Sequence, residues 1–245
     1  MNHSLGQGFV VQKIADILGF PLIALQKGED ASRPTVYLSS GIHGDEPAAP
    51  MAMSELLKSG FFANQANWRI CPILNPIGLD LGQRENANGI DLNRDFRVPK
   101  TTEVIAYTNW ISKQPNPDLS IALHEDWEST GFYMYQIRPT VSENLFAPRI
   151  LRTVAKLGPI ESSTEIDGHA AAGGLIEPYA SKLEIDKTEI WSEADYQCHR
   201  HPHWHFTFET PSCLSLELRI RMQIRAVKEA MRILPSVSRL SSIKD

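Results

Sequence analysis

Short apolar segments alternate with helical segments along this chain of 245 residues, and this alternation is the feature that most restricts its fold. Strands inside a parallel sheet need both faces covered, and the helices between them supply that cover. The expected strands are 35–40, 68–74, 119–123, 132–137 and 205–208, and the expected helices are 48–59, 101–112, 143–157 and 215–234. The pattern predicts an α/β fold with three layers, α/β/α, around a central mixed, mainly parallel sheet, and residues 1–245 in one domain.

Composition narrows the class of protein. The formal net charge is −5, which offers no general attraction for nucleic acid, and no run of apolar residues is long enough to predict a membrane span. The first 25 residues lack the features of a signal peptide. Cys71, Cys198 and Cys213 are few and widely spaced, which is typical of reduced thiols rather than of a disulfide framework. We therefore expect a soluble, cytoplasmic protein with no nucleic-acid or membrane partner.

Polar residues gather where the expected strands end. His43 and Glu46 follow the first strand, a polar loop over 75–94 follows the second, and His124 and Glu209 follow two later strands. In open α/β sheets, ligands bind at the edge formed by the carboxyl ends of the strands. The sequence therefore predicts a functional site at that edge.

His43 and Glu46 form the core of a candidate metal site. They are three residues apart in a strand-to-helix turn, where an imidazole and a carboxylate can reach one cation, and His124 would add a third ligand. Two histidines and one glutamate leave an open position on zinc for a water molecule, which the ion acidifies. In the alternative interpretation, His43 is a hydrogen-bonded turn histidine and Glu46 only stabilises the N-terminus of the following helix.

The stretch from His124 to Glu128 is a rival metal motif. It does not match H-E-x-x-H, because position 128 is glutamate rather than histidine. We expect Glu125, Asp126 and Glu128 to lie either behind the metal ligands or at the surface, mainly as solvated groups.

The loop over 84–94 presents Arg84, Asn93 and Arg94. A guanidinium group binds a carboxylate through two parallel hydrogen bonds, and one that lies near a metal can stabilise an oxyanion. In the alternative interpretation, Arg94 pairs with Asp91 or Asp95 and the loop is only a connector.

The motifs G-x-H-G-x-E over 41–46 and R-x-N-x-x-G-x-D-L-N-R-x-F over 84–96 resemble the M14 family of zinc carboxypeptidases, whose wider group includes succinylglutamate desuccinylases and aspartoacylases. The resemblance extends over about residues 35–230. It implies a zinc carboxypeptidase-like fold and one zinc ion per chain. The roles that it implies are zinc ligation by His43, Glu46 and His124, oxyanion polarisation by Arg84, binding of a terminal carboxylate by Asn93 and Arg94, and base catalysis by Glu209.

The chain also departs from the digestive carboxypeptidases. Glu125 follows His124 where those enzymes carry a small residue, and the compact arginine loop is more similar to small bacterial members such as murein peptide amidases. Tyr179 and Tyr196 both lie in the interval that would hold the family's substrate-capping tyrosine, and each is also consistent with ordinary packing.

Two carboxylates are candidates for the general base. Glu209 follows the apolar strand residues 206–208, where a buried carboxylate can take a proton from water and return it to a leaving amine. Glu217 is the alternative, but we expect it on the last helix, paired with Arg219 or Arg221.

Histidines occupy every second position from His199 to His205. In an extended strand they would share one face and could form a second metal site or a basic substrate rim. Pro202 favours an edge or a loop, so we expect an exposed polar segment beside the mouth of the cavity. We expect His169, among the small residues 167–174, in a mobile loop.

These observations predict a zinc metallopeptidase that hydrolyses a C-terminal peptide or peptide-like amide bond with a metal-bound water. The expected substrate is a small peptide or an acyl-amino acid with a free carboxylate. An N-acyl amino acid deacylase is the alternative enzyme, and a non-catalytic metal-binding module is the alternative of a different class.

Overall fold

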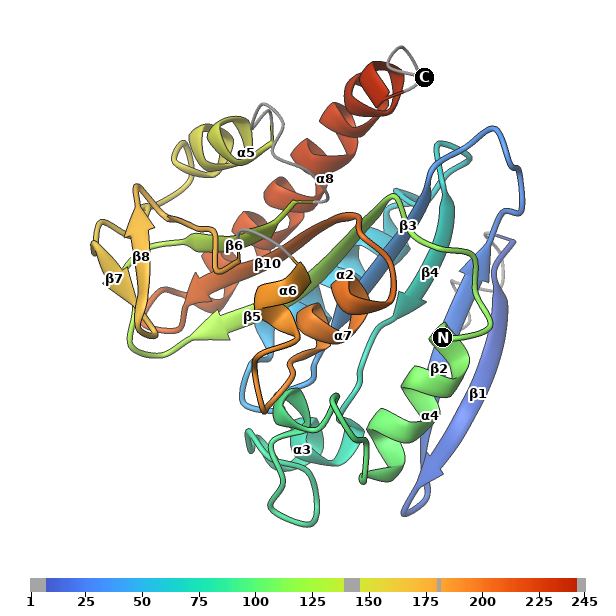
Figure 1. Ribbon diagram of the computed structural model, residues 1–245. Helices are drawn as coiled ribbons and strands as arrows, with labels where there is room; N and C mark the ends of the chain where they lie inside the picture. Colours follow the sequence, from blue (N-terminus) through green and yellow to red (C-terminus); the bar gives the residue numbers. More distant parts are fainter. Residues whose placement is uncertain (1–7, 139–145, 180–181, 242–245) are drawn as a thin grey trace.

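A single mixed sheet organises the computed structural model, which describes residues 8–138, 146–179 and 182–241 (Figure 1). The strands in chain order are β1 Val10–Ile17, β2 Phe20–Lys27, β3 Thr35–Ser40, β4 Asn67–Cys71, β5 Leu119–Asp126, β6 Tyr133–Ile137, β7 Glu165–Ile166, β8 His169–Ala172, β9 Leu175–Ile176 and β10 Trp204–Pro211. They lie side by side in the order β1-β2-β4-β3-β5-β10-β6-β9-β8-β7.

Helices occupy most of the connections between these strands. They are α2 Ala48–Lys58, α3 Pro76–Leu81, the 3-10 helix η1 Leu92–Arg94, α4 Thr102–Ile111, α5 Ala147–Val154, α6 Lys182–Ile185, α7 Glu193–Arg200 and α8 Leu216–Ser241. Within the described residues, no helix combines the length and the apolar character needed to cross a membrane.

The centre of the sheet is parallel and most of its flanking pairs are antiparallel. β4, β3, β5 and β10 pair in parallel, so their carboxyl ends meet at one edge. Antiparallel pairs add β2 and β1 on one side and β6 on the other, and the short strands β7 to β9 extend the sheet beyond β6. The expected mixed sheet is confirmed, and its parallel character is concentrated in these central strands.

The sheet separates two apolar cores, because successive side chains along a strand point to opposite faces. Val36 and Leu38 of β3 join the core that also contains buried residues of α2, α5 and α8. Tyr37, between them in sequence, joins the core that contains buried residues of α4 and α7. Helices therefore cover both faces (Figure 1), and the predicted three-layer arrangement is confirmed.

The expected elements are present, with shifted ends. β5 continues to Asp126, so His124 lies inside the strand rather than beyond its end. α5 begins at Ala147, and the part of the expected helix over 143–145 lies outside the described residues. The sequence pattern does not predict the antiparallel strands β1 and β2 or the short helix α7.

Candidate metal centre and substrate cavity

One cavity of about 630 Å³ opens where the central strands end. It is lined by all seven residues that the sequence had singled out for a site: His43, Glu46, Arg84, Asn93, Arg94, His124 and Glu209. They come from four separate segments of the chain, and only the fold brings them together.

His43 lies in the tight turn that follows β3 and is buried. The turn packs against α3 and the residues that follow it, since the Gly44 N–H donates to the Gln83 carbonyl at 2.9 Å. A side chain at Gly44 would place its Cβ only 1.8 Å from the carbonyl carbon of Gly78. Glycine at this position therefore allows the turn after β3 to touch α3. This contact brings the arginine loop, which follows α3, beside His43.

We expect Gly44→Ala to destabilise the fold and distort the site, because neither backbone can move away without breaking this contact. Overpacking typically costs about 1–3 kcal/mol, and a backbone clash of this depth belongs at or above the upper end. Thermal unfolding and metal content would measure both effects. Gly158→Ala is the matched control, because the closest contact of its Cβ would be the flexible end of Met222 at 3.3 Å. Equal stability of the two variants would contradict the prediction.

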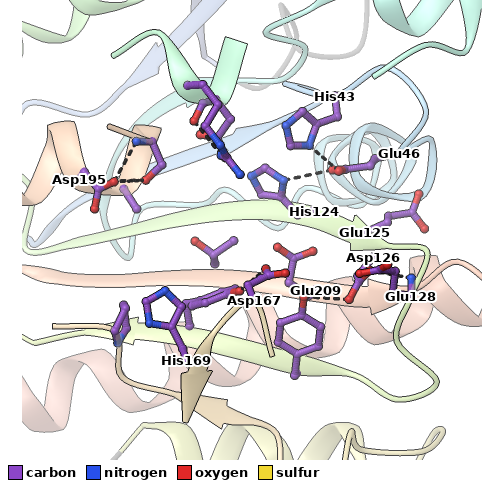
Figure 2. Close-up of a pocket in the computed structure, with 18 of the residues that line it drawn as sticks. His43, Glu46, His124, Glu125, Asp126, Glu128, Asp167, His169, Asp195 and Glu209 are labelled. Carbon is purple, nitrogen blue, oxygen red and sulfur yellow. Dashed lines mark hydrogen bonds and ion pairs between the residues drawn. The ribbon is translucent and has the colours of Figure 1, made fainter. Parts of the chain in front are cut away.

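The Glu46 carboxylate lies between two imidazoles (Figure 2). Its Oε1 is 2.5 Å from His43 Nδ1 and its Oε2 is 3.1 Å from His124 Nδ1. The second contact has ion-pair distance but not hydrogen-bond geometry, so Oε2 is a buried oxygen without a hydrogen-bond partner among the described residues. One ligand atom from each of the three residues falls within 4.8 Å of the others. This donor set and its orphaned oxygen fit a single zinc ion.

Proton affinities in this group are coupled through charge. Burial by itself would lower the pKa of His43, but Glu46 and Asp91 raise it to about 9. Burial would raise the pKa of Glu46, but His124 and His43 lower it to about 2. Without a metal, protons on the histidines therefore balance the buried carboxylate.

Asp91 holds Arg84 beside the candidate metal ligands. The Arg84 Nη2 and Nε lie 3.0 and 3.1 Å from Asp91 Oδ2, and the Arg84 Nη1 lies 3.2 Å from His43 Nδ1. Asp91 also lies 3.2 Å from His43 Nε2 through its other oxygen. The acid that the sequence offered as a partner for Arg94 thus positions Arg84 and His43 instead.

Asn93 and Arg94 lie on η1 at the rim of the same cavity. Asn93 Oδ1 accepts a hydrogen bond from the Glu193 N–H at 2.9 Å, which leaves its amide nitrogen as the group offered to a ligand. Arg94 is exposed, and its Nη1 donates to the Asn93 carbonyl oxygen at 3.0 Å. Asp95 does not pair with Arg94; it accepts hydrogen bonds from Thr101, at the start of α4.

Glu209 of β10 is the register neighbour of His124 in the parallel pair with β5. Burial raises its pKa well above 4.5, and the negative charge of Glu46 adds to this effect while His124 opposes it. Glu217 is exposed on α8 and does not line the cavity. Arg219, its expected partner, pairs with Glu125 instead.

Glu125 is buried, so the expectation of a solvated group was wrong. Successive side chains alternate across β5, so Glu125 points away from His124 and toward the start of α2. There its Oε1 accepts a hydrogen bond from the Ala48 N–H at 2.7 Å. Glu125 therefore satisfies a free N–H at a helix end that no N-cap side chain serves. Asp126 is half-buried, and Glu128 is exposed as expected.

The histidine run is neither one extended face nor an exposed segment. His199 lies on α7, His201 follows the end of that helix, and only His205 belongs to β10. His203 and His205 are buried. The run changes direction within residues 201–203, which are the only residues between the end of α7 and the start of β10.

Further residues that the sequence does not assign to the cavity also line it, among them Asp126, Tyr133, Tyr135, Asp167, His169, Asp195 and Thr207. Tyr133 and Tyr135 are two residues apart on β6, as Thr207 and Glu209 are on β10, so each pair lies on one face of the sheet. The sequence alone does not show that β6 and β10 are paired, so it could not predict that these residues share a cavity. His169 lies on the strand β8 rather than in a loop. Of the two candidate capping tyrosines, Tyr179 lines the cavity, whereas Tyr196 packs against Phe96.

Parts of the chain are similar in sequence to known proteins. Residues 32–144 match the family described as the succinylglutamate desuccinylase/aspartoacylase catalytic domain. Murein peptide amidase A of Escherichia coli K12 is 33% identical over 103 residues, which is 42% of this chain and 42% of the amidase. Carboxypeptidase SOL1 of Arabidopsis thaliana is 32% identical over 93 residues, which is 32% of this chain and 19% of that protein. These matches therefore span less than half of the curated relatives.

Solved structures extend the likeness in fold to nearly the whole chain. A metallopeptidase structure from Shewanella amazonensis superposes with a TM-score of 0.83 at 21% identity, covering 95% of this chain and 90% of the other. A metallo-carboxypeptidase from Burkholderia cenocepacia gives 0.68 at 16% identity, covering 94% and 65%. Residues 32–144, less than half of the chain, are therefore similar to the succinylglutamate desuccinylase/aspartoacylase catalytic domain, and nearly the whole chain shares the fold of these metallopeptidase and metallo-carboxypeptidase structures.

Proposed function

We propose that this protein is a zinc-dependent hydrolase of a C-terminal peptide or peptide-like amide bond. The observation that carries the proposal is the convergence of His43, Glu46 and His124 beside a buried carboxylate and an arginine in one open cavity. Murein peptide amidase and carboxypeptidases among the similar proteins support a peptide-like substrate.

The three ligands would hold one zinc ion. A zinc ion there would act as a Lewis acid toward the scissile carbonyl and lower the pKa of a water molecule. Arg84, fixed by Asp91, would donate to the oxygen on which negative charge develops. This arrangement requires no movement of the guanidinium at the moment of reaction.

Glu209 would act as the general base and then as the general acid. Its buried position raises the proton affinity of the carboxylate. A carboxylate of raised pKa accepts a proton more readily and can return it to the leaving amine. At the rim, the Arg94 guanidinium and the Asn93 amide would bind a free carboxylate of the substrate.

The alternative activity is deacylation of an N-acyl amino acid, which the matching catalytic-domain family favours. A substrate panel would separate the two: peptides with a free C-terminus, the same peptides with an amidated C-terminus, and succinyl- or acetyl-amino acids. We expect cleavage of the free peptides, at least about 10-fold weaker cleavage of the amidated ones because the Arg94 contact is lost, and little deacylation. Preferential deacylation would establish the alternative, and no hydrolysis by zinc-loaded protein would contradict both.

Zinc binding should release protons. At pH 7 His43 carries a proton in the metal-free protein, because its pKa is about 9, and zinc binds only the neutral imidazole. We therefore expect about one or more protons released per zinc ion at pH 7, and an affinity that increases as the pH rises toward about 9. Calorimetric titration in buffers of different ionisation enthalpy measures this number. A binding heat independent of the buffer would show that His43 is not a ligand or is already neutral.

We further propose that the chain works as one domain in the cytoplasm. The three cysteines are free, two of them buried, as expected for a reducing compartment. Cell fractionation of the tagged protein would test the location.

A further inference from the structure

A buried chain of hydrogen bonds ends at the wall of the substrate cavity. The Ser120 Oγ lies 2.6 Å from His203 Nε2 and 2.6 Å from His205 Nδ1. At one end, His203 Nδ1 lies 2.6 Å from the His201 carbonyl oxygen. At the other end, His205 Nε2 lies 3.0 Å from Thr207 Oγ1, and Thr207 lines the cavity two residues before Glu209.

The carbonyl at one end fixes the direction of every hydrogen bond. A carbonyl only accepts, so His203 carries its proton on Nδ1 and its Nε2 is bare. The Ser120 hydroxyl must then donate to His203 and accept from His205 Nδ1. His205 Nε2 is therefore also bare, and the Thr207 hydroxyl donates to it. Thr207 thus keeps only acceptor lone pairs for a ligand.

This argument requires both imidazoles to be neutral. The pKa of His203 is lowered to about 4 and that of His205 well below 6.5, mainly because both side chains are buried, and the charges of nearby histidines contribute to both shifts. Both side chains are at most 3% exposed, so water does not compete for their nitrogens. A doubly protonated His205 would be a buried charge for which the described residues supply no counter-ion.

The tyrosines on the neighbouring strand are arranged in the same way. The Tyr133 hydroxyl donates to Asp126 at 3.0 Å, and the Tyr135 hydroxyl donates to Asp167 at 2.7 Å. Both hydroxyls therefore also face the cavity as acceptors. We name this side of the cavity the acceptor wall. It lies on β6, β10 and the segments that adjoin them, and it consists of Asp126, Tyr133, Tyr135, Asp167 and Thr207. Arg84 and Arg94 on the loop that follows α3 supply donors to the same cavity.

We infer that the acceptor wall selects a hydrogen-bond-donating group of the substrate, a primary ammonium group in particular, and that Ser120 and His205 are positioning residues that hold Thr207 as an acceptor. This inference rests on the proposed function for the identity of the cavity as the substrate site. A carbonyl or carboxylate placed against this wall would face lone pairs only, which is unfavourable.

A second metal site is the competing explanation of the same side chains. Cys198, His203 and His205 bring ligand atoms within 4.8 Å of one another. Burial raises the pKa of the Cys198 thiol, however, and every ring nitrogen of the two histidines already has a hydrogen-bond partner. The hydrogen-bond chain therefore accounts for the cluster without an ion, and metal binding becomes an outcome of the test.

The first experiment reads the proton positions directly. In the zinc-loaded protein labelled with ¹⁵N-histidine, NMR should show His203 and His205 as neutral tautomers protonated on Nδ1. Their shifts should stay constant over the range of pH about 5 to 8 in which exposed histidines titrate. A proton on His205 Nε2, or a charged His205, would overturn the inference. So would a second metal equivalent that gives a sulfur-to-cobalt charge-transfer band after Co²⁺ substitution, because the His43 site contains no sulfur.

The second experiment measures selectivity by binding, without catalysis. Free lysine and free norleucine differ by the terminal ammonium group, and the ratio of their Kd values reports its recognition. Thr207→Val should reduce the preference for lysine about 10-fold, whereas Thr207→Ser should retain it, because only the serine keeps the hydroxyl. Ser120→Ala should weaken the preference and return His205 to a mixture of tautomers although Thr207 is unchanged.

These readouts separate the two proposals. Lysine preference that depends on Thr207 and Ser120, in a protein that hydrolyses none of the tested amides, would support the acceptor wall and reject the proposed hydrolase. Equal preference in wild type, Thr207→Val and Ser120→Ala would overturn the inference whatever the activity.

Discussion

Glu209→Gln is expected to lower kcat by about 10²–10⁴-fold while the zinc content stays at about one ion per chain. Glutamine keeps the size and polarity of the side chain but cannot take a proton from water or return it to the leaving amine. The carboxylate lies next to His124 in the sheet but is not one of the clustered ligand atoms, so the metal should remain. KM should change little, because Glu209 is not one of the residues proposed to bind the substrate carboxylate, Asn93 and Arg94.

Two variants serve as controls for this result. Glu128→Gln removes an exposed carboxylate from the lining of the same cavity, and Glu217→Gln removes the other candidate base, which lies outside the cavity. Both should retain kcat within about 2-fold, as is usual for surface positions. A large loss in Glu217→Gln together with a mild loss in Glu209→Gln would reassign the base.

Removing one zinc ligand should have the largest effect of all. We expect His43→Ala and His124→Ala each to reduce bound zinc from about one ion per chain to a trace, and hydrolysis to fall to background. Two remaining ligands hold zinc weakly, and Glu46 then keeps only one imidazole to balance its buried charge. Elemental analysis after gel filtration, beside an activity assay, measures both quantities.

His199→Ala is the control for these two variants, because His199 lies on α7 and pairs with Asp186 away from the ligand cluster. It should keep full zinc and activity. Full zinc in both His43→Ala and His124→Ala would reject the proposed site and direct attention to Cys198, His203 and His205. Circular dichroism distinguishes loss of metal from loss of fold.

The local pattern of the sequence determined the elements and the identity of the candidate site residues. Apolar runs such as residues 35–40 could be read as strands, because both of their faces must be covered. The H-x-x-E spacing indicated His43 and Glu46, and the resemblance to the zinc carboxypeptidases implied the role of Arg84. His124 and Glu209 could be found because each follows a run of apolar strand residues.

Only the tertiary structure decided which groups meet and what each one faces. Glu125 follows His124 directly in the chain, yet one points to the start of α2 and the other to the metal group, because strand side chains alternate. Asp91 holds Arg84 rather than Arg94, since the turn at Gly44 sets the arginine loop beside His43. The buried hydrogen-bond chain from His203 through Ser120 to Thr207 depends on Ser120 and His203, which are 83 positions apart in the sequence. They meet only because β5 pairs with β10. A sequence specifies local conformation through short-range preferences, whereas proton directions and pKa values depend on long-range neighbours that appear only after the chain has folded.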